Sequence, residues 1–177
     1  MSRSDATKSA LVHNARLLFW AKGFSNVSLR QIATAAGVDV ALISRYFGSK
    51  VGLFQATMTE LPVFDLENLP NPDAFVEIMV ENFATAERED PTPSPVTFLL
   101  ANMNDDEVGD MVRADFQANW HGPLTSLMGD ASKASQFTAA LLGFSIAEKS
   151  LKLDGIAHHQ SDAYKEQLRS FLSGSFD

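Results

Sequence analysis

The sequence predicts an all-α protein with a small N-terminal helical domain and a larger helical body. Apolar residues recur at the three- and four-residue spacing of amphipathic helices, and no segment shows the alternation of a half-buried strand. A helix–glycine turn–helix pattern occupies residues 28–50. Residues 1–54 contain seven basic and two acidic residues, whereas the remainder contains seven basic and twenty acidic residues. The two parts therefore carry opposite net charges and are expected to meet different partners.

The composition of the 177 residues limits the class of protein. An apolar fraction of 45% is enough for a sizeable core, and no apolar run approaches the roughly 20 residues of a membrane-spanning helix. The chain has no cysteine, which excludes disulfides, a thiolate nucleophile and a cysteine-ligated metal. Because the N-terminus also lacks the pattern of a signal peptide, we expect a cytoplasmic protein that has no membrane partner.

The first helix is expected to end at Gly23. Apolar residues at helical spacing precede this glycine, which can adopt the left-handed conformation that closes a helix. Phe24, the next residue, can then fold back onto Phe19. This helix should support the two helices that follow it.

The pattern over residues 28–50 follows from local chemistry. Ser28 can cap a helix, and Gln31, three residues later, can reach back to it in a capping box. Gly37 supplies a left-handed turn that other residues adopt at a cost, and Asp39 can cap the next helix. Two helices joined by a short glycine-containing turn form the helix-turn-helix unit, whose second helix, the recognition helix, enters the major groove of DNA.

The recognition helix has two different faces. The residues with apolar spacing, expected to face the core, are Leu42, Ile43 and Phe47. The residues of the opposite ridge are Val40, Ala41, Ser44 and Arg45. Arg45 is the only long polar side chain on this ridge, and its guanidinium can pair with the O6 and N7 edge of guanine. A solvated surface is the alternative for any one of these residues alone.

Residues 8–58 resemble the DNA-binding part of the TetR/AcrR family of bacterial one-component transcriptional regulators. The two runs that carry the resemblance are ALVHNARLLFWAKGFSNVSLRQIATAAGV and GVDVALISRYFGSKVGLF. The individual matches are Ala15, Phe19, Gly23, Phe24, Ser28, Ile32, Ala33, Ala36, Gly37, Val38, Tyr46, Phe47, Lys50 and Leu53. The resemblance implies a three-helix DNA-binding domain followed by a helical dimerisation and ligand-binding domain. We place these domains at residues 1–61 and 62–177.

The resemblance also implies roles for single residues. Ser28, Tyr46 and Lys50 match phosphate contacts, and the exposed ridge of the recognition helix matches the residues that line the groove. With the basic Arg30 included, the expected DNA-binding residues are Ser28, Arg30, Val40, Ala41, Ser44, Arg45, Tyr46 and Lys50. The family often has lysine, glycine and tyrosine at the first three ridge positions and an acidic residue at Val51. The ridge here is less polar, so contacts to thymine methyl groups can replace polar ones.

The rest of the chain predicts a helical body after Pro62. Helices are expected over about 72–88, 96–103, 105–120, 132–153 and 162–172. In the resembled family the last two long helices pair with their copies in a homodimer. The corresponding candidates are Phe137, Ala140, Leu141, Gly143, Phe144, Ala147, Leu151, Leu168, Phe171 and Leu172. Packing within one chain is the alternative. A symmetric dimer would require a near-palindromic double-stranded operator.

In the resembled family the middle helices enclose a cavity for a small, often apolar effector. The candidate lining residues are Phe75, Met79, Phe83, Phe98, Met103, Met111, Phe116 and Trp120. Plain core packing is the alternative for each of them.

We therefore expect a homodimeric repressor that a small molecule releases from its operator. One alternative is a DNA-binding regulator without an effector, whose body only dimerises or binds a protein partner. A helical enzyme or carrier is a second alternative, but the sequence has no glycine-rich phosphate loop, nucleophile elbow or zinc-protease helix. We expect no cofactor, no catalytic residues and no metal site, since the adjacent pair His158–His159 has poor spacing for a metal.

Overall fold

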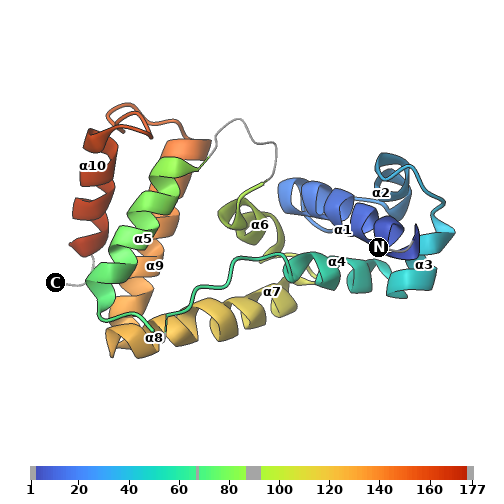
Figure 1. Ribbon diagram of the computed structural model, residues 1–177, viewed down its shortest axis with the longest axis horizontal. Coiled ribbons are helices and arrows are strands. Elements are labelled where there is room, and N and C mark those ends of the chain that lie inside the picture. Colours follow the sequence, from blue (N-terminus) through green and yellow to red (C-terminus); the bar gives the residue numbers. More distant parts are fainter. Residues whose placement is uncertain (1–2, 67, 87–92, 175–177) are drawn as a thin grey trace. The chain divides into compact units, whose positions relative to one another are not determined.

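The computed structural model describes residues 3–66, 68–86 and 93–174, and within these ranges all regular structure is helical (Figure 1). The predicted all-α fold is therefore confirmed. The chain forms two compact units, the first made of Met1–Val63 and Pro91–Ala114 and the second of Phe64–Asp90 and Asp115–Asp177. None of the helices in the described residues is long and apolar enough to cross a membrane.

The first unit is built around α1. Its helices are α1 (Arg3–Lys22), α2 (Leu29–Ala35), α3 (Ala41–Phe47), α4 (Lys50–Met58), α6 (Pro95–Asn102) and most of α7 (Gly109–Phe116). Three buried aromatic rings form the centre of its core. The ring centroids of Phe19, Phe24 and Phe54 lie 5.4 to 5.6 Å apart, in stacked and edge-on pairs. Gly23 has a φ of +82°, and Phe24 folds back onto Phe19 as predicted.

Helix α6 packs in the first unit, although the sequence-based boundary assigns it to the body. The buried ring of Phe98 lies 5.1 Å from Trp20 of α1 and 5.8 Å from Phe54 of α4, measured between ring centroids. Asn102 at the end of α6 is fully buried against the end of α1. The difference arises because an apolar stripe on α6 shows that the helix is covered but does not show which helices cover it.

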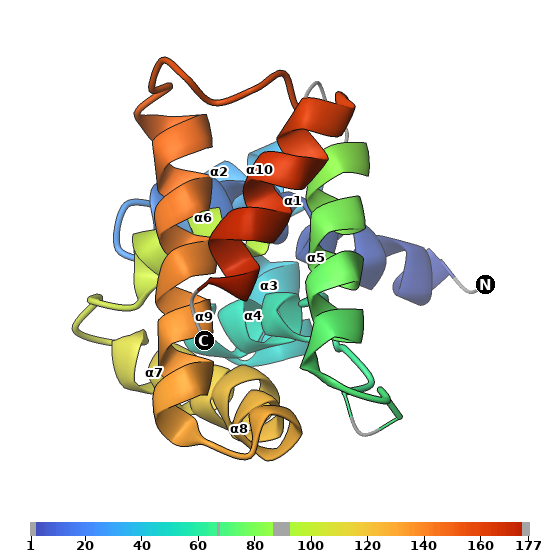
Figure 2. The same cartoon turned by 90° about the vertical axis from the view of Figure 1, so that its left-hand side faces the viewer.

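The second unit has α5, α9 and α10 side by side (Figures 1 and 2). The bounds of its helices are α5 (Pro72–Thr85), α8 (Gly122–Met128), α9 (Ala131–Ser145) and α10 (Asp162–Ser173). Asn71 caps α5 by accepting a hydrogen bond from the N–H of Ala74 at 3.0 Å, with Pro72 in the first turn, as the sequence predicts. The core between these helices contains the fully buried Phe75, Phe137, Tyr164, Leu168 and Leu172.

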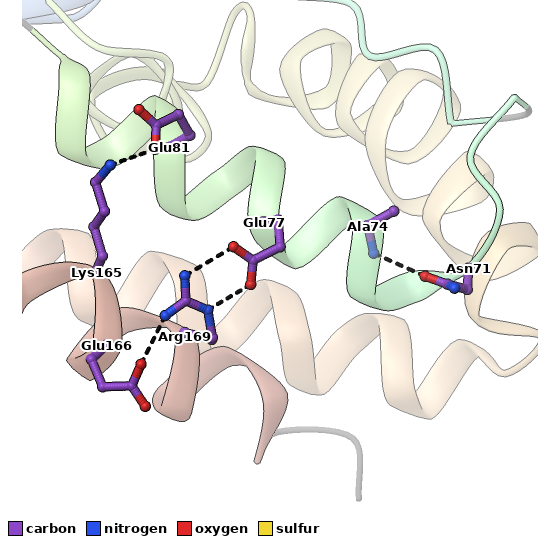
Figure 3. A network of polar contacts seen from close by, with 7 residues as sticks. All are labelled: Asn71, Ala74, Glu77, Glu81, Lys165, Glu166 and Arg169. Carbon is purple, nitrogen blue, oxygen red and sulfur yellow. Dashed lines mark hydrogen bonds and ion pairs between the residues drawn. The ribbon is translucent and has the colours of Figure 1, made fainter. Parts of the chain in front are cut away.

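A row of ion pairs joins α5 to α10 at the surface of this core (Figure 3). The guanidinium of Arg169 donates to both carboxylate oxygens of Glu77, at 2.5 and 2.9 Å, and Lys165 donates to Glu81 at 2.7 Å. The hydrogen bonds from Arg169 lower the pKa of Glu77 despite an opposing contribution from partial burial. Because these side chains are substantially exposed, we expect the ion pairs to add little to the free energy of unfolding. Their main effect should be to fix how α5 and α10 are aligned along each other.

Two predicted long helices are interrupted by π-helical turns. The predicted helix over 105–120 begins only at Gly109 and passes through a π turn, η1 (Gln117–His121), into α8. Pro123 has no N–H to continue an α-helical ladder, and the N–H of Gly122 reaches back five residues to Gln117 instead. The predicted helix over 132–153 ends in a second π turn, η2 (Ile146–Ser150), after which Lys152 adopts a φ of +51°. Helix α5 ends at Thr85, three residues before the predicted end at Arg88, which lies outside the described residues.

Candidate nucleic-acid interface

The start of α2 and the turn between α2 and α3 are fixed by side chains that the sequence singles out. Ser28 accepts a hydrogen bond from the N–H of Gln31 at 3.2 Å, while the Gln31 amide oxygen accepts from the N–H of Ser28 at 2.7 Å. This is the predicted capping box. Gly37 has a φ of +67°. The N-cap of α3 is Val40 and not the predicted Asp39, but the carboxylate of Asp39 still accepts a hydrogen bond from the N–H of Ala41, the first residue of the helix, at 2.7 Å. The start and orientation of the recognition helix α3 are therefore set by local contacts.

Helix α3 buries one face and exposes the other, as predicted. Ile43 is fully buried, and Leu42 and Phe47 are half-buried against the same core. The residues of the opposite ridge, Val40, Ala41, Ser44 and Arg45, are all exposed. The exposed fraction of Val40 is 41%, which leaves an apolar side chain free to contact a partner. The ridge thus presents one guanidinium beside small and apolar side chains, a set that suits guanine edges and thymine methyl groups.

Basic and hydroxyl groups surround this ridge. Ser28 and Arg30 are exposed on the first turn of α2. Ser49 caps α4 by accepting from the N–H of Gly52 at 3.0 Å, and so fixes the helix start that carries Lys50. The ammonium of Lys50 lies 4.1 Å from the centroid of the Phe24 ring, and this contact holds the positive charge at the start of α4.

Tyr46 is half-buried at the end of α3, between two cations. The ammonium of Lys8 lies 5.3 Å from the ring centroid, and the guanidinium carbon of Arg45 lies 5.9 Å from it. The hydroxyl of Tyr46 accepts a long hydrogen bond of 3.4 Å from Ser4 of α1. All eight sequence-predicted DNA-binding residues therefore belong to α2, α3, α4 and the turns that begin them, and all lie in the first unit.

A buried amide from α6 supports this unit, and nothing in the sequence distinguishes it from other asparagines. The side chain of Asn102 donates to the carbonyl oxygens of Phe19 at 3.1 Å and Phe98 at 2.8 Å, and accepts from the N–H of Phe24 at 2.8 Å. It therefore satisfies the N–H of Phe24, just beyond the end of α1, and adds a second hydrogen bond to the carbonyl of Phe19, which also accepts from the N–H of Gly23. The match between this amide and the backbone groups of Phe19 and Phe24 becomes visible only once the helices are packed.

Asp105 makes a second link to the same turn. Its carboxylate accepts from the hydroxyl of Ser25 at 2.6 Å and from the N–H groups of Ser25, Glu107 and Val108 at 3.0 to 3.2 Å. Partial burial pushes the pKa of Asp105 upward, but these hydrogen bonds outweigh it and lower the pKa below its ordinary value. The turn after α1 is therefore tied to α6 and to the segment that precedes α7.

The structure divides the eight pocket candidates between the two units. The candidates that pack with the core of the first unit are Phe98, Met103 and Met111. The candidates in the second unit are Phe75, Met79, Phe83, Phe116 and Trp120. Phe75 and Met79 are buried, and the ring of Trp120 lies 5.8 Å from Phe75 and 6.2 Å from Phe116 between centroids. The eight candidates therefore do not line one common site: three pack in the core of the first unit, and the other five lie in the second unit.

The ten dimer candidates differ in their exposure. The side chains that are buried in the core of their own unit are Phe137, Leu141, Phe144, Leu168 and Leu172. Ala140 and Ala147 are half-buried, and the exposed candidates are Gly143, Leu151 and Phe171. Intrachain packing therefore accounts for the buried five, and a partner could reach only the others.

No cluster of histidine, aspartate and glutamate that could hold a metal ion occurs among the residues that the structure describes. The rings of His158 and His159 lie 4.8 Å apart between centroids in the segment between η2 and α10.

Comparisons with known proteins agree with this geometry. Residues 11–57 match the family described as "Bacterial regulatory proteins, tetR family". Over 55 residues the chain is 46% identical to the "Probable HTH-type transcriptional regulator YttP" of Bacillus subtilis (strain 168). That match covers 31% of this chain and 27% of the relative, so the chain matches about a quarter of the relative's length.

Solved structures share the fold over nearly the whole chain. One is NalD, described as the secondary repressor of the MexAB-OprM multidrug efflux pump in Pseudomonas aeruginosa, with a TM-score of 0.74 and 19% identity over 99% of this chain and 98% of that one. Another is a mutant of HlyIIR in which one segment is replaced by a GSSGSSG linker, with a TM-score of 0.65 and 19% identity over 99% of both chains. Residues 11–57, which contain the helix-turn-helix unit, thus match the tetR family of bacterial regulatory proteins, and the chain as a whole shares the all-helical fold of these solved structures.

Proposed function

We propose that the protein is a sequence-specific DNA-binding transcriptional regulator, a homodimeric repressor that a small molecule releases from its operator. The observation that carries the DNA-binding part is the exposed ridge of α3, where Arg45 stands beside Val40 and Ala41 and is flanked by Tyr46 and Lys50. The capping box at the start of α2 and the hydrogen bond from Ala41 to Asp39 at the start of α3 help to hold this ridge in place, as base reading requires.

The charge distribution supports the same proposal. Residues 1–54 have a net charge of +5, from seven basic and two acidic residues, and the remaining residues have a net charge of −13, from seven basic and twenty acidic residues. A basic reading surface attracts the phosphate backbone, and an acidic body is kept away from it. Affinity for DNA should therefore fall steeply as salt rises, because each phosphate contact releases condensed counterions.

Arg45 and the small residues of the ridge are expected to contact different bases. A bidentate arginine selects guanine, whereas Val40 and Ala41 offer methyl groups that suit thymine. Ser28, Arg30, Tyr46 and Lys50 then supply phosphate contacts that position α3 without reading sequence. Each operator half-site is expected to combine a guanine contact with neighbouring thymines.

Dimerisation through the exposed parts of α9, η2 and α10 would pair two such heads. Gly143 lets another helix approach closely, and Leu151 and Phe171 expose 62% and 50% of their surface. Apolar side chains exposed to this degree are normal singly but suit an interface when a partner covers them. A two-fold axis then requires two half-sites about one helical turn of DNA apart, or a multiple of this.

Release by a small molecule would be a population shift. An effector that binds the form with low DNA affinity more tightly moves the dimer off the operator, by no more than its differential affinity for the two forms. The aromatic cluster of Phe75, Phe116 and Trp120 is the best candidate for its contacts, because these rings lie together in the second unit.

A regulator without an effector is the second candidate, and one observation favours it. Phe75 packs against Phe137 at 5.5 Å and against Trp120 at 5.8 Å between ring centroids, and the indole N–H of Trp120 donates to the hydroxyl of Thr138 at 3.0 Å. The rings and the indole N–H of this cluster thus already have packing and hydrogen-bonding partners within the chain, as in an ordinary core. The two candidates differ in whether any ligand raises the unfolding temperature of the protein and weakens its DNA binding.

Selection from a library of random DNA duplexes tests the proposed function. We expect enrichment of a near-palindromic sequence with two half-sites, and loss of the enrichment in the variant Arg45→Ala. A wild-type protein that enriches no sequence above the input library would contradict the proposal.

A further inference from the structure

The first turns of α1 lie against the end of the recognition helix. Ser4 donates a hydrogen bond to the hydroxyl of Tyr46 at 3.4 Å, and the ammonium of Lys8 lies 5.3 Å from the centroid of the same ring. Ser4 and Lys8 are four residues apart, so both side chains lie on one face of α1. This face is therefore directed at Tyr46, although α1 is not part of the two-helix motif.

The Tyr46 ring connects Lys8 to the reading surface. Arg45 contacts the same ring, with its guanidinium carbon 5.9 Å from the centroid. Lys8 and Arg45 are both exposed, while Tyr46 is half-buried. A cation on an exposed ring is held weakly, so the Lys8 ammonium keeps access to solvent and can exchange the ring for a stronger anionic partner.

We propose that Lys8 is an additional contact to the DNA backbone and binds a phosphate next to the one that Tyr46 contacts. This inference rests on the proposed function and extends the interface from α2, α3 and α4 to α1. The ammonium contributes charge without a base-reading geometry, because it is a point charge with freely rotating donors. Its contribution should therefore be equal on all DNA sequences, unlike that of Arg45.

The test compares Lys8→Gln with Lys22→Gln by measuring DNA affinity across a salt series. Lys22 is exposed at the other end of α1, so both variants lose one positive charge from the same helix. We expect Lys8→Gln, with two copies in the dimer, to reduce the slope of log affinity against log salt by about 1.8, at ~0.9 per phosphate contact. Between 50 and 200 mM salt, wild-type affinity would then fall about twelvefold further than that of the variant. Lys22→Gln should leave the slope unchanged.

Further readouts separate a phosphate contact from support of Tyr46. We expect Lys8→Gln to weaken binding to the selected operator and to scrambled DNA by the same factor, Lys8→Arg to restore both affinities, and the unfolding temperature to stay unchanged. A loss confined to the operator with an unchanged salt slope would overturn the inference, because Lys8 would then act by positioning Arg45. If wild type binds DNA and Lys8→Gln behaves like Lys22→Gln, the inference alone fails. If wild type binds no duplex, the proposed function fails with it.

Discussion

Replacing Asn102 by alanine tests whether α6 is an integral part of the DNA-binding unit. The substitution removes three hydrogen bonds at 2.8 to 3.1 Å, all to backbone groups. The carbonyl of Phe19 keeps a bond from the N–H of Gly23 at 3.0 Å, so the cost falls mainly on the N–H of Phe24, whose residue is 1% exposed. A buried donor left without a partner costs about 1–3 kcal/mol, and each hydrogen bond contributes about 1 kcal/mol net. We therefore expect a loss of about 3 kcal/mol, which is large against the 5–15 kcal/mol typical of a domain.

The two tryptophans show which unit loses stability in the Asn102→Ala variant. Trp20 lies in α1 of the first unit and Trp120 in η1 of the second, and the chain contains no other tryptophan. In a Trp120→Phe background, the fluorescence of Trp20 reports unfolding of the first unit in urea. The matched control is Asn104→Ala, at an exposed asparagine in the turn after α6.

The comparison between the two asparagines decides the outcome. Asn104→Ala should change the unfolding free energy by no more than about 0.5 kcal/mol, as exposed substitutions usually do. The reasoning would be refuted if Asn102→Ala fell within the same range, or if it shifted only the transition that Trp120 reports in the reciprocal Trp20→Phe background.

Three other predictions concern single side chains. Arg45→Ala should weaken binding to the selected operator by about 1–3 kcal/mol in titrations and leave binding to scrambled DNA almost unchanged; equal losses on both would exclude base reading. Gly23→Ala should lower the unfolding temperature much more than Gly37→Ala, because both glycines have a positive φ but only a Cβ at Gly23 would lie 2.7 Å from a backbone oxygen of α6; similar losses would argue against this close approach. Since the pKa of Asp105 is lowered on folding, its contribution to stability is present above the ordinary value of 3.8 and is lost as pH falls through the folded-state pKa. Asp105→Asn should therefore flatten the acid limb of the curve of stability against pH, and an unchanged limb would contradict this assignment.

The parts of the fold that follow from local chemistry could be predicted from the sequence. The capping box of Ser28 and Gln31, the left-handed turn at Gly37 and the cap of Asn71 all depend on residues within a few positions of one another. The first two of these features help to place α3, so the arrangement of the candidate DNA-binding residues was predictable from the motif.

The features that depend on distant contacts were not predictable in the same way. Asn102 meets Phe19 and Phe24 across about eighty positions of sequence, and the assignment of α6 to the first unit depends on that meeting. The π turns η1 and η2 leave no clear mark on the apolar periodicity.

The same limit applies to the dimer and pocket candidates. Apolar spacing on α9 and α10 predicts that a face is covered, but it does not distinguish the chain itself from a second copy. Phe137, Leu141 and Leu168 are covered by their own unit, whereas Phe171 and Leu151 remain exposed. Only a measurement of the oligomer with substitutions at the exposed positions can assign the interface.

Sequence-selective binding of DNA is the central claim, and fluorescence anisotropy of a labelled duplex tests it most directly. The selected duplex and a scrambled duplex of the same composition would each be titrated with the wild-type protein at several salt concentrations. We expect tighter binding to the selected duplex by a factor of about 10³ or more, with an affinity for both duplexes that falls steeply with salt. Equal and weak binding to both duplexes by a folded protein would contradict the claim that the ridge of α3 reads DNA.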